Sequence, residues 1–476
     1  MSTLRSSEQA TSSAGDPHDF YDPGQLLFAA WDVWLSTHAG AQHVQRVAEQ
    51  RLRNVVTLAR ERAPFYRDLY RGLPAAQCQI EHLPVVRKGE LMAHFDAAVI
   101  DPRVTAARVR RFLEDERLAG HPLLDRYAVW VSSGTTGEPG VFVHDGRALA
   151  VYEVLQAIRF RHAGFPTPLS AVFLATDRYA LIGATGGHFA GNASVERLRF
   201  LHPWLADRVR TFSILDPTAT LTRRLNEYRP TLVATYPTAA SLLAEEQRAG
   251  RLAIKPREVW TGGEQLSSAQ RADISEAFCC RVRDDYGASE FLSIAWDCGR
   301  GALHVNADWV ILEPVDERYH RVPAGVASHT VLITNLANRV LPLIRYDLGD
   351  SVTLLDRPCE CGSQLPAIRV EGRCDDVLAV TDATGRTVKL LPLALTTVLE
   401  DQAGAYRFQL IQVDATTLLL RLDPHSATAA SALECRRALG RFLQARGATN
   451  VQVDVERQPL QPHPVSGKLR RVVAVH

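Results

Sequence analysis

The sequence contains few lysines, almost no net charge and no long apolar stretch. The lysines are Lys88, Lys255, Lys389 and Lys468, and arginine fills the other 50 of the 54 basic positions, so few ammonium groups compete for a catalytic role. The formal net charge of +1 indicates neither a nucleic-acid nor a membrane partner. No run of 18 apolar residues occurs and residues 1–20 have no signal-peptide core, so we expect a cytoplasmic protein.

Cysteine is also sparse, with 8 residues in a chain of 476. This content does not predict a disulfide framework, and a close pair such as Cys359 and Cys361 in a cytosolic protein indicates metal binding instead. Apolar content of 46% and charged content of 22% are ordinary for a globular protein. The length is typical of two or three domains rather than of one core.

The pattern of apolar residues changes along the chain. Residues 1–20 are rich in Ser and Thr and are expected to be disordered, and residues 23–70 have helical spacing. Between about residues 125 and 350, short apolar runs alternate with amphipathic segments, which indicates α/β layers. From residue 373 the pattern is that of a compact α+β unit. We therefore predict an α/β protein with domains at 21–372 and 373–476.

A loop rich in glycine and hydroxyl groups at residues 131–140 follows a strand-like run at 127–131. Its glycines allow backbone N–H groups to approach an anion closely, and its hydroxyls add further donors. It is not a P-loop, because Glu138 follows Gly137 where that motif has lysine. From these residues alone, an ordinary Ser/Gly turn remains an equal alternative. The residues proposed to hold phosphate are Ser132, Ser133, Gly134, Thr135, Thr136 and Gly137.

The motifs that follow this loop occur in a recognisable order. They are Gly262-Gly263-Glu264, Tyr286-Gly287-Ala288-Ser289-Glu290, the segments 345–350 and 372–376, and Ser466-Gly467-Lys468. With the earlier segments 63–67 and 83–88, the series resembles the adenylate-forming superfamily of acyl-CoA synthetases and adenylation domains. Within that superfamily it is most similar to the phenylacetate-CoA ligase group. The resemblance covers roughly residues 45–476.

The resemblance implies a large N-terminal domain of layered α/β sheets and a small, mobile α+β lid. It also implies that ATP and Mg²⁺ activate a carboxylic acid, with Glu290 as the Mg²⁺ ligand. Tyr286 and Gly287 would flank the adenine opposite the backbone of Gly262-Gly263-Glu264. From the residues alone, Glu290 could equally be a solvated carboxylate after a turn and Tyr286 a core aromatic. The lysine that the family often has near the end of the phosphate loop is missing, since Glu138 and Gly140 stand there.

Four further residues receive roles from the same resemblance. Asp350 would accept hydrogen bonds from the ribose, and Arg373 would lie near the nucleotide. Asp375 would be the hinge of the lid, and Lys468 would reach the α-phosphate as charge develops there. Each role has an alternative: Asp350 could cap a turn and Arg373 could form a structural ion pair. Asp375 could be an exposed linker residue, and Lys468 could belong to a solvated basic tail. We take Lys468, Glu290 and Thr136 as the candidate catalytic residues.

A metal site is indicated by Cys298, His304, Cys359 and Cys361. Three thiolates and one imidazole can form a closed, tetrahedral zinc site, which would be structural because no coordination position stays open. The spacing differs from that of a standard zinc finger, and scattered reduced cysteines are the alternative. Some phenylacetate-ligase-like proteins have a similar Cys/His set.

The sequence therefore predicts activation of a carboxylic acid, favoured to be an aryl acid, followed by acyl transfer to a thiol, with coenzyme A as the implied acceptor. Transfer to a carrier protein or an amine is one alternative, and a non-catalytic nucleotide-binding relative is another. The acid is expected near Tyr236, Gly263 and Ala288. The oligomeric state stays open, with a homodimer among the options.

Overall fold

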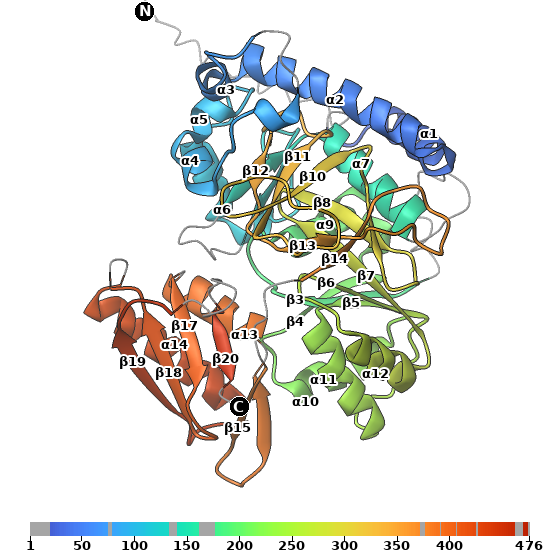
Figure 1. Ribbon diagram of the computed structural model, residues 1–476. Coiled ribbons are helices and arrows are strands. Elements are labelled where there is room, and N and C mark those ends of the chain that lie inside the picture. Colours follow the sequence, from blue (N-terminus) through green and yellow to red (C-terminus); the bar gives the residue numbers. More distant parts are fainter. Residues whose placement is uncertain are drawn as a thin grey trace, which may run out of the picture.

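A computed structural model describes residues 20–74, 79–132, 140–160, 177–371, 377–390, 392–405, 407–424, 427–461 and 470–474. Helices and mixed sheets alternate through it, so the predicted α/β class is confirmed. Figure 1 shows the N-terminal helices across the top, a large sheet below them and a separate C-terminal unit at the lower left. No helix within the described ranges is long and apolar enough to cross a membrane. The predicted disordered segment lies outside the described residues apart from Phe20, which is buried.

The N-terminal helices begin where the sequence provides caps and prolines. Asp22 accepts a hydrogen bond from the Gly24 backbone N–H at 2.8 Å, and Pro23 occupies the first turn, where no backbone donor is needed. Pro64 ends one helix and opens the next. The helices are α1 Pro23–His38, α2 Ala41–Arg62, α3 Pro64–Leu69, α4 Lys88–Ala93, α5 Phe95–Ala98 and α6 Ala106–Leu113.

The central sheet has nine strands in the order β13-β14-β9-β8-β7-β6-β5-β3-β4. Strands β3 to β7 pair in parallel, whereas β7, β8, β9, β14 and β13 pair antiparallel. The strands are β3 Tyr179–Gly183, β4 Val209–Ser213, β5 Leu232–Thr235, β6 Glu258–Gly262, β7 Arg281–Ala288, β8 Phe291–Asp297, β9 Leu303–Val305, β13 Val352–Leu354 and β14 Ala367–Val370. Helices α9 Ala190–Leu201, α10 Thr218–Tyr228, α11 Pro237–Arg248 and α12 Ser268–Phe278 connect the parallel strands. The carboxyl ends of β6 and β7 thus meet, as is usual at ligand sites of α/β sheets.

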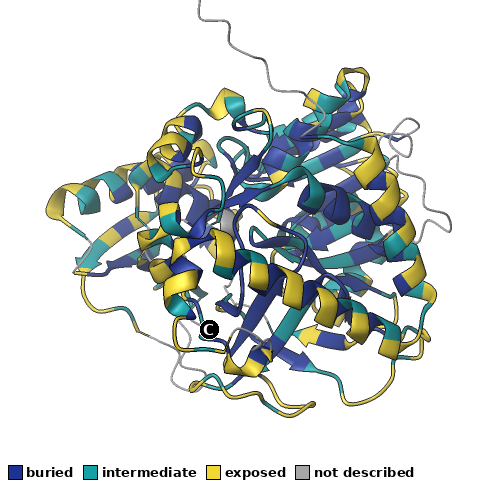
Figure 2. Ribbon diagram, turned by 90° about the horizontal axis from the view of Figure 1, so that it is seen from above, coloured by how far each residue is buried: buried dark blue, intermediate teal, exposed yellow. Residues whose placement is uncertain are grey.

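Smaller sheets enclose the main core beside the central sheet. Strands β1 Ala128–Val131 and β2 Val141–His144 form a hairpin across the phosphate loop, and α7 Gly146–Leu155 follows. Strands β10 Val310–Val315, β11 Thr330–Asn335 and β12 Tyr346–Asp347 form a second sheet. Figure 2 shows the buried strands in the interior and the exposed faces of the helices around them.

The C-terminal segment has its own sheet and core. It contains the pair β15 Leu378–Thr381 and β16 Thr387–Leu390, and a four-stranded sheet in the order β19-β18-β17-β20. Its other elements are α13 Pro392–Thr397, β17 Phe408–Gln412, β18 Thr417–Leu422, α14 Ala429–Ala445, β19 Gln452–Arg457 and β20 Val472–Ala474. Ile214 and Ala239 of the larger part pack into its core, and Arg446 donates to the Ile214 carbonyl at 2.9 Å. The domain boundary at Arg373 and the mobility of this unit stay predictions.

Candidate functional site

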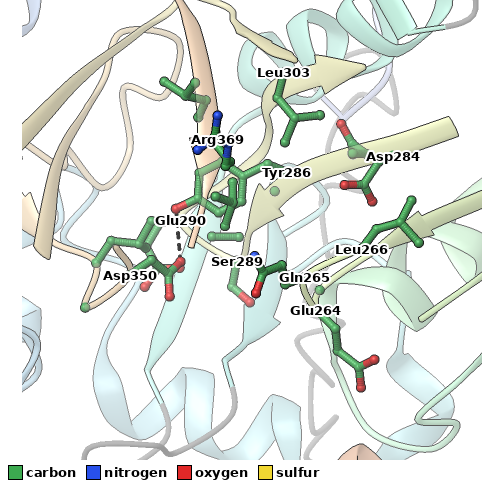
Figure 3. Close-up of a pocket in the computed structure, with 18 of the residues that line it drawn as sticks. Glu264, Gln265, Leu266, Asp284, Tyr286, Ser289, Glu290, Leu303, Asp350 and Arg369 are labelled. Atoms are coloured by element: carbon green, nitrogen blue, oxygen red, sulfur yellow. Dashed lines mark hydrogen bonds between the residues drawn. The ribbon is translucent and has the colours of Figure 1, made fainter. Parts of the chain in front are cut away.

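A cavity of about 910 Å³ opens at the carboxyl ends of β6 and β7. Segments that lie far apart in the sequence form its wall, and most of them come from the ordered motifs. Eight of the predicted site residues line it: Ser132, Gly263, Glu264, Tyr286, Gly287, Ala288, Glu290 and Asp350. In the view of Figure 3, Glu290 and Asp350 lie on one side of Tyr286, and Asp284 and Leu266 lie on the other.

The side chains of Tyr286 and Asp350 are joined by a hydrogen bond. The Tyr286 hydroxyl donates to Asp350 Oδ2 at 3.0 Å, so the ring leans along the cavity wall (Figure 3). On the neighbouring strand end, Gly263 adopts a φ of +77°, and a Cβ there would lie 3.0 Å from the Tyr236 ring. A glycine at 263 therefore allows a turn that a side chain would both strain and block.

Glu290 is a buried acid whose backbone is firmly held. Its carbonyl accepts from the Asn335 amide at 3.0 Å, and the same amide group donates to the Tyr152 hydroxyl at 2.9 Å. Burial raises the pKa of Glu290 to about 7, and the nearby charge of Lys88 opposes this shift. The arrangement fixes a carboxyl group that favours the approach of a cation.

Lys88 is a cavity residue to which the sequence analysis gave no role. It is the first residue of α4 and lines the cavity. A Cβ built at Gly140 would lie 2.9 Å from Lys88 Cε and 2.9 Å from Ser132 Oγ, so the lysine stem passes the end of the hydroxyl-rich loop. The scarcity of lysine and the position of Lys88 in one of the family-like segments were the available signals.

Tyr236 and Glu264 hold the turn behind Gly263. The Glu264 carboxylate accepts from the Thr238 backbone N–H at 3.0 Å and from the Thr238 hydroxyl at 3.1 Å. Tyr236 fits between Gly183 and Gly263, and burial raises its pKa to about 12. Of the predicted acid pocket, Gly263 and Ala288 line the cavity, whereas Tyr236 lies behind Gly263. Gly262 pairs with Asp285 on β7.

Several predicted site residues lie outside the described residues, so their roles stay predictions. They are Ser133, Gly134, Thr135, Thr136, Gly137, Arg373, Asp375 and Lys468. Only the two ends of the phosphate loop are described. The Ser132 N–H donates to the Gly140 carbonyl at 2.8 Å, and the Gly140 N–H donates to Ser132 Oγ at 3.1 Å. These bonds hold the ends of the loop together at the cavity.

Acidic residues near the carboxyl end of β7 were also missed from sequence. Burial raises the pKa of Asp284 to about 7, while the Thr261 hydroxyl, which donates to it at 2.7 Å, acts in the opposite direction. Arg271 pairs with Asp297 at 2.6 Å across the same wall. The guanidinium of Arg369 also lines the cavity (Figure 3). The sequence shows two adjacent aspartates before Tyr286, but it does not show that their carboxyl groups are buried.

The four predicted metal ligands come together. Cys298 follows β8, His304 lies on β9, and Cys359 and Cys361 lie on the loop before β14. Their ligand atoms all lie within 4.8 Å of one another, with 3.6 Å between the Sγ atoms of Cys298 and Cys359 and 3.1 Å between Cys361 Sγ and His304 Nε2. His304 Nδ1 lies 2.9 Å from the Leu365 carbonyl, which directs Nε2 toward the thiols. The predicted grouping is confirmed.

Comparisons with known proteins agree with this geometry. A scan of protein-family models gives no match. Phenylacetate-coenzyme A ligase of Thermus thermophilus is 25% identical over 384 residues, which are 75% of this chain and 75% of that protein. The chain is therefore similar in sequence to a member of the adenylate-forming superfamily. Protein CapK of Staphylococcus aureus is 26% identical over 134 residues, or 28% of each chain.

Solved structures show that the chain has the fold of an acyl-CoA ligase. A crystal structure of 2-hydroxyisobutyryl-CoA ligase in complex with 2-HIB-AMP and CoA, in the thioesterification state, has a TM-score of 0.54 and is 22% identical. The match covers 92% of this chain and 91% of that chain. At this coverage the match includes the C-terminal unit, and at this identity it shows a similar fold.

Proposed function

We propose that the protein activates an aryl carboxylic acid with ATP and transfers the acyl group to coenzyme A. The carboxylate oxygen attacks the α-phosphorus and pyrophosphate leaves, which gives an acyl-adenylate. A thiol then attacks the acyl carbon and AMP leaves. The observation that carries the proposal is the single cavity in which Lys88, Glu290, Tyr286 and Asp350 meet at the end of the hydroxyl-rich loop. The names of the similar proteins, a phenylacetate-CoA ligase among them, support the acid and the acceptor.

Each cavity residue has a part in this reaction. Tyr286 and the backbone at Gly263 would hold the adenine between them, and Asp350 would accept from the ribose hydroxyls. The loop from Ser132 to Thr136 would hold phosphate oxygens. Lys88 would supply, from α4, the positive charge that the loop lacks at Glu138 and Gly140.

Magnesium fits the carboxylate of Glu290, since Mg²⁺ is usually held by one or two carboxylates together with substrate phosphates. When bound, the ion would neutralise charge on the leaving pyrophosphate. Glu290 is buried, and the Asn335 amide holds its backbone carbonyl. The fold thus fixes this ligand before the ion arrives.

Zinc fits the Cys298, His304, Cys359 and Cys361 cluster. The 3.6 Å between two sulfur atoms is near the edge of a tetrahedron whose metal–sulfur bonds are about 2.3 Å. We propose that this ion is structural, because four protein ligands leave no open position and the cluster joins β8, β9 and the loop before β14.

The C-terminal unit would act as a lid that brings Lys468 to the α-phosphate and rotates about Asp375 for thiol transfer. In this structure it packs on the larger part through Ile214 and Ala239, and Lys389 forms an ion pair with Glu245. The ion pair is partly exposed, which suits an interface that separates during a catalytic cycle.

A pyrophosphate-release screen tests the proposed function. Aryl and aliphatic acids are supplied with ATP and Mg²⁺, with and without coenzyme A, and AMP and ADP are separated from the same reactions. We expect acid-dependent AMP and pyrophosphate, with aryl acids preferred. Glu290→Gln is the matched control for contaminating activity. Formation of ADP and phosphate, or no turnover with any acid, would overturn the proposal.

A further inference from the structure

One wall of the cavity contains a carboxyl group, that of Asp285, with one oxygen left unpaired among the described residues. Asp285 on β7 lines the cavity, and its Oδ1 is shielded from solvent and has no hydrogen-bond partner. On β8, the buried Ser293 hydroxyl has no partner of ordinary hydrogen-bond geometry among the described residues. It faces Asp285, and its interaction with that carboxyl lowers the pKa of Asp285, against the effect of burial.

The neighbouring acid shows what Asp285 lacks. Asp284 accepts from the Thr261 hydroxyl at 2.7 Å, and the charge of Arg271 stabilises its ionised form. Burial and the charge of Asp284 together raise the pKa of Asp285 well above its usual range, and no basic side chain acts on it. A buried polar atom without a partner is unfavourable, and at a cavity wall a ligand can supply the missing bond.

The residues that pair with Asp285 on the two neighbouring strands are a glycine and a tryptophan. In register, Asp285 pairs with Gly262 on β6 and with Trp296 on β8. Side chains at paired positions share one face of a sheet, so the carboxyl lies beside an indole on one strand and beside a residue without a side chain on the other. Two residues before Gly262, Trp260 packs edge-on against Phe160, with ring centroids 5.3 Å apart.

This position is next to the residues assigned to the reaction. Asp285 precedes Tyr286 on the same strand, and Gly263 and Ala288 of the expected acid pocket line the same cavity. A buried carboxyl oxygen without a hydrogen bond selects a ligand that brings a hydrogen-bond donor, because an apolar ligand would leave that oxygen unpaired.

We propose that Asp285, assisted by Ser293, recognises a hydrogen-bond donor on the body of the carboxylic acid, so that the substrate is an amino- or hydroxy-substituted acid. This rests on the proposed function, which it deepens by naming the substituent. Asp285 is thus a specificity-determining residue and takes no part in bond making or breaking.

Matched pairs of acids test the proposal. Benzoate is compared with its amino and hydroxy derivatives, phenylacetate with hydroxyphenylacetate, and propionate with lactate, using kcat/KM for pyrophosphate release. We expect the wild type to favour the donor-bearing member of at least one pair by about tenfold or more. Asp285→Leu should abolish or reverse that preference, and Asp285→Asn should reduce it while preserving the shape of the side chain.

Asp284→Asn is the matched control, because it neutralises the adjacent buried acid that already has partners. It should change both members of a pair by the same factor. In Asp285→Leu, kcat/KM could fall equally for both members of each pair, or the KM for ATP could rise with every acid. Either result would assign Asp285 to nucleotide binding and overturn the proposal. An absence of preference in the wild type would also overturn it.

A binding measurement separates this proposal from the proposed function. Thermal shifts of the full chain with each acid, without ATP, should show greater stabilisation by the donor-bearing acid in the wild type and not in Asp285→Leu. If no acid releases pyrophosphate, the proposed function fails while this readout still tests Asp285. If acids react but neither assay distinguishes the pairs, only the role of Asp285 fails.

Discussion

Two groups of buried charges in this protein are treated in opposite ways by the fold. In the first, Arg159 is almost fully buried and donates to both carboxylate oxygens of Asp308, at 2.6 and 2.9 Å, and to Asn306 and Thr37. Arg51 donates to the Asp308 carbonyl at 2.7 Å, so that acid is bonded on several sides.

The second group, at the cavity, has buried acids whose partners do not offset the effect of burial on their pKa values. Burial raises the pKa of Asp284 and of Glu290 to about 7, and it also raises that of Asp285 well above its usual range. A charge buried for structural reasons comes with its partner, because an unpaired one would destabilise the fold. Acids without such partners mark the place where a substrate or metal ion completes the set.

The largest expected effect comes from breaking the paired group. Arg159→Met leaves the Asp308 carboxylate buried without its main partner and should lower the free energy of unfolding by about 3–5 kcal/mol. Chemical denaturation measures this loss. Arg147→Met, at a half-buried arginine without such a bidentate partner, is the comparison and should cost much less. Equal losses would mean that burial of the stem, rather than pairing, stabilises this region.

Lys88→Ala tests the cavity side of the comparison. Removal of a charge that acts on the phosphates as pyrophosphate leaves should lower the rate of adenylate formation by about a hundredfold, with little change in stability. Pyrophosphate release gives the rate and thermal denaturation gives the stability. Lys255→Ala, at one of the few other lysines, is the control and should leave both unchanged. A loss of stability that matches the loss of rate would assign Lys88 to structure.

The Cys/His cluster is a third group of side chains, and its thiolates are expected to need a zinc ion as their partner. Cys359→Ser should remove most of the zinc and lower the melting temperature by several degrees, since metal binding is coupled to folding. Metal analysis of protein purified without added zinc is the measurement, and Cys435→Ser, at a buried cysteine far from the cluster, is the control. Zinc retained in full by Cys359→Ser would contradict the assignment.

Asp284→Asn should give the smallest effect, and it should depend on pH. The folded state raises the pKa of Asp284 from 3.8 to about 7, so the ionised form becomes increasingly unfavourable as the pH rises between those values. The asparagine variant should therefore gain stability over the wild type across that range, levelling off on the order of 1–2 kcal/mol above pH 7. Denaturation at pH 5 and pH 8 measures the difference. A gain that is the same at both would exclude titration of Asp284 as its cause.

The order of motifs in the sequence predicted much of this arrangement. The α/β layers followed from the alternation of apolar runs and amphipathic segments. The meeting of Tyr286 and Asp350 in one cavity followed from the family resemblance that the motifs carry, and the grouping of the four Cys and His ligands from their chemistry together with that resemblance. The roles of these residues in activating the carboxylic acid stay predictions, which the experiments above test.

Other features depend on contacts that no local pattern contains. Lys88 reaches the phosphate loop only because α4 lies beside Gly140, some fifty residues further along the chain. Asp285 is adjacent to Asp284 in sequence, yet only the folded structure shows that Asp284 accepts from the Thr261 hydroxyl whereas one oxygen of Asp285 has no hydrogen bond. Tyr236, which is proposed for the acid pocket, packs between Gly183 and Gly263, a contact that joins three segments of the chain and that no local pattern contains.

Transfer of oxygen from the acid to AMP is the most direct test of the central claim. A substrate acid labelled with oxygen-18 in its carboxyl group is converted with ATP, Mg²⁺ and coenzyme A, and the nucleotide products are analysed by mass spectrometry. Attack of the carboxylate on the α-phosphorus predicts a labelled oxygen in AMP and none in pyrophosphate. Label in free phosphate together with ADP, or AMP without label, would contradict the account.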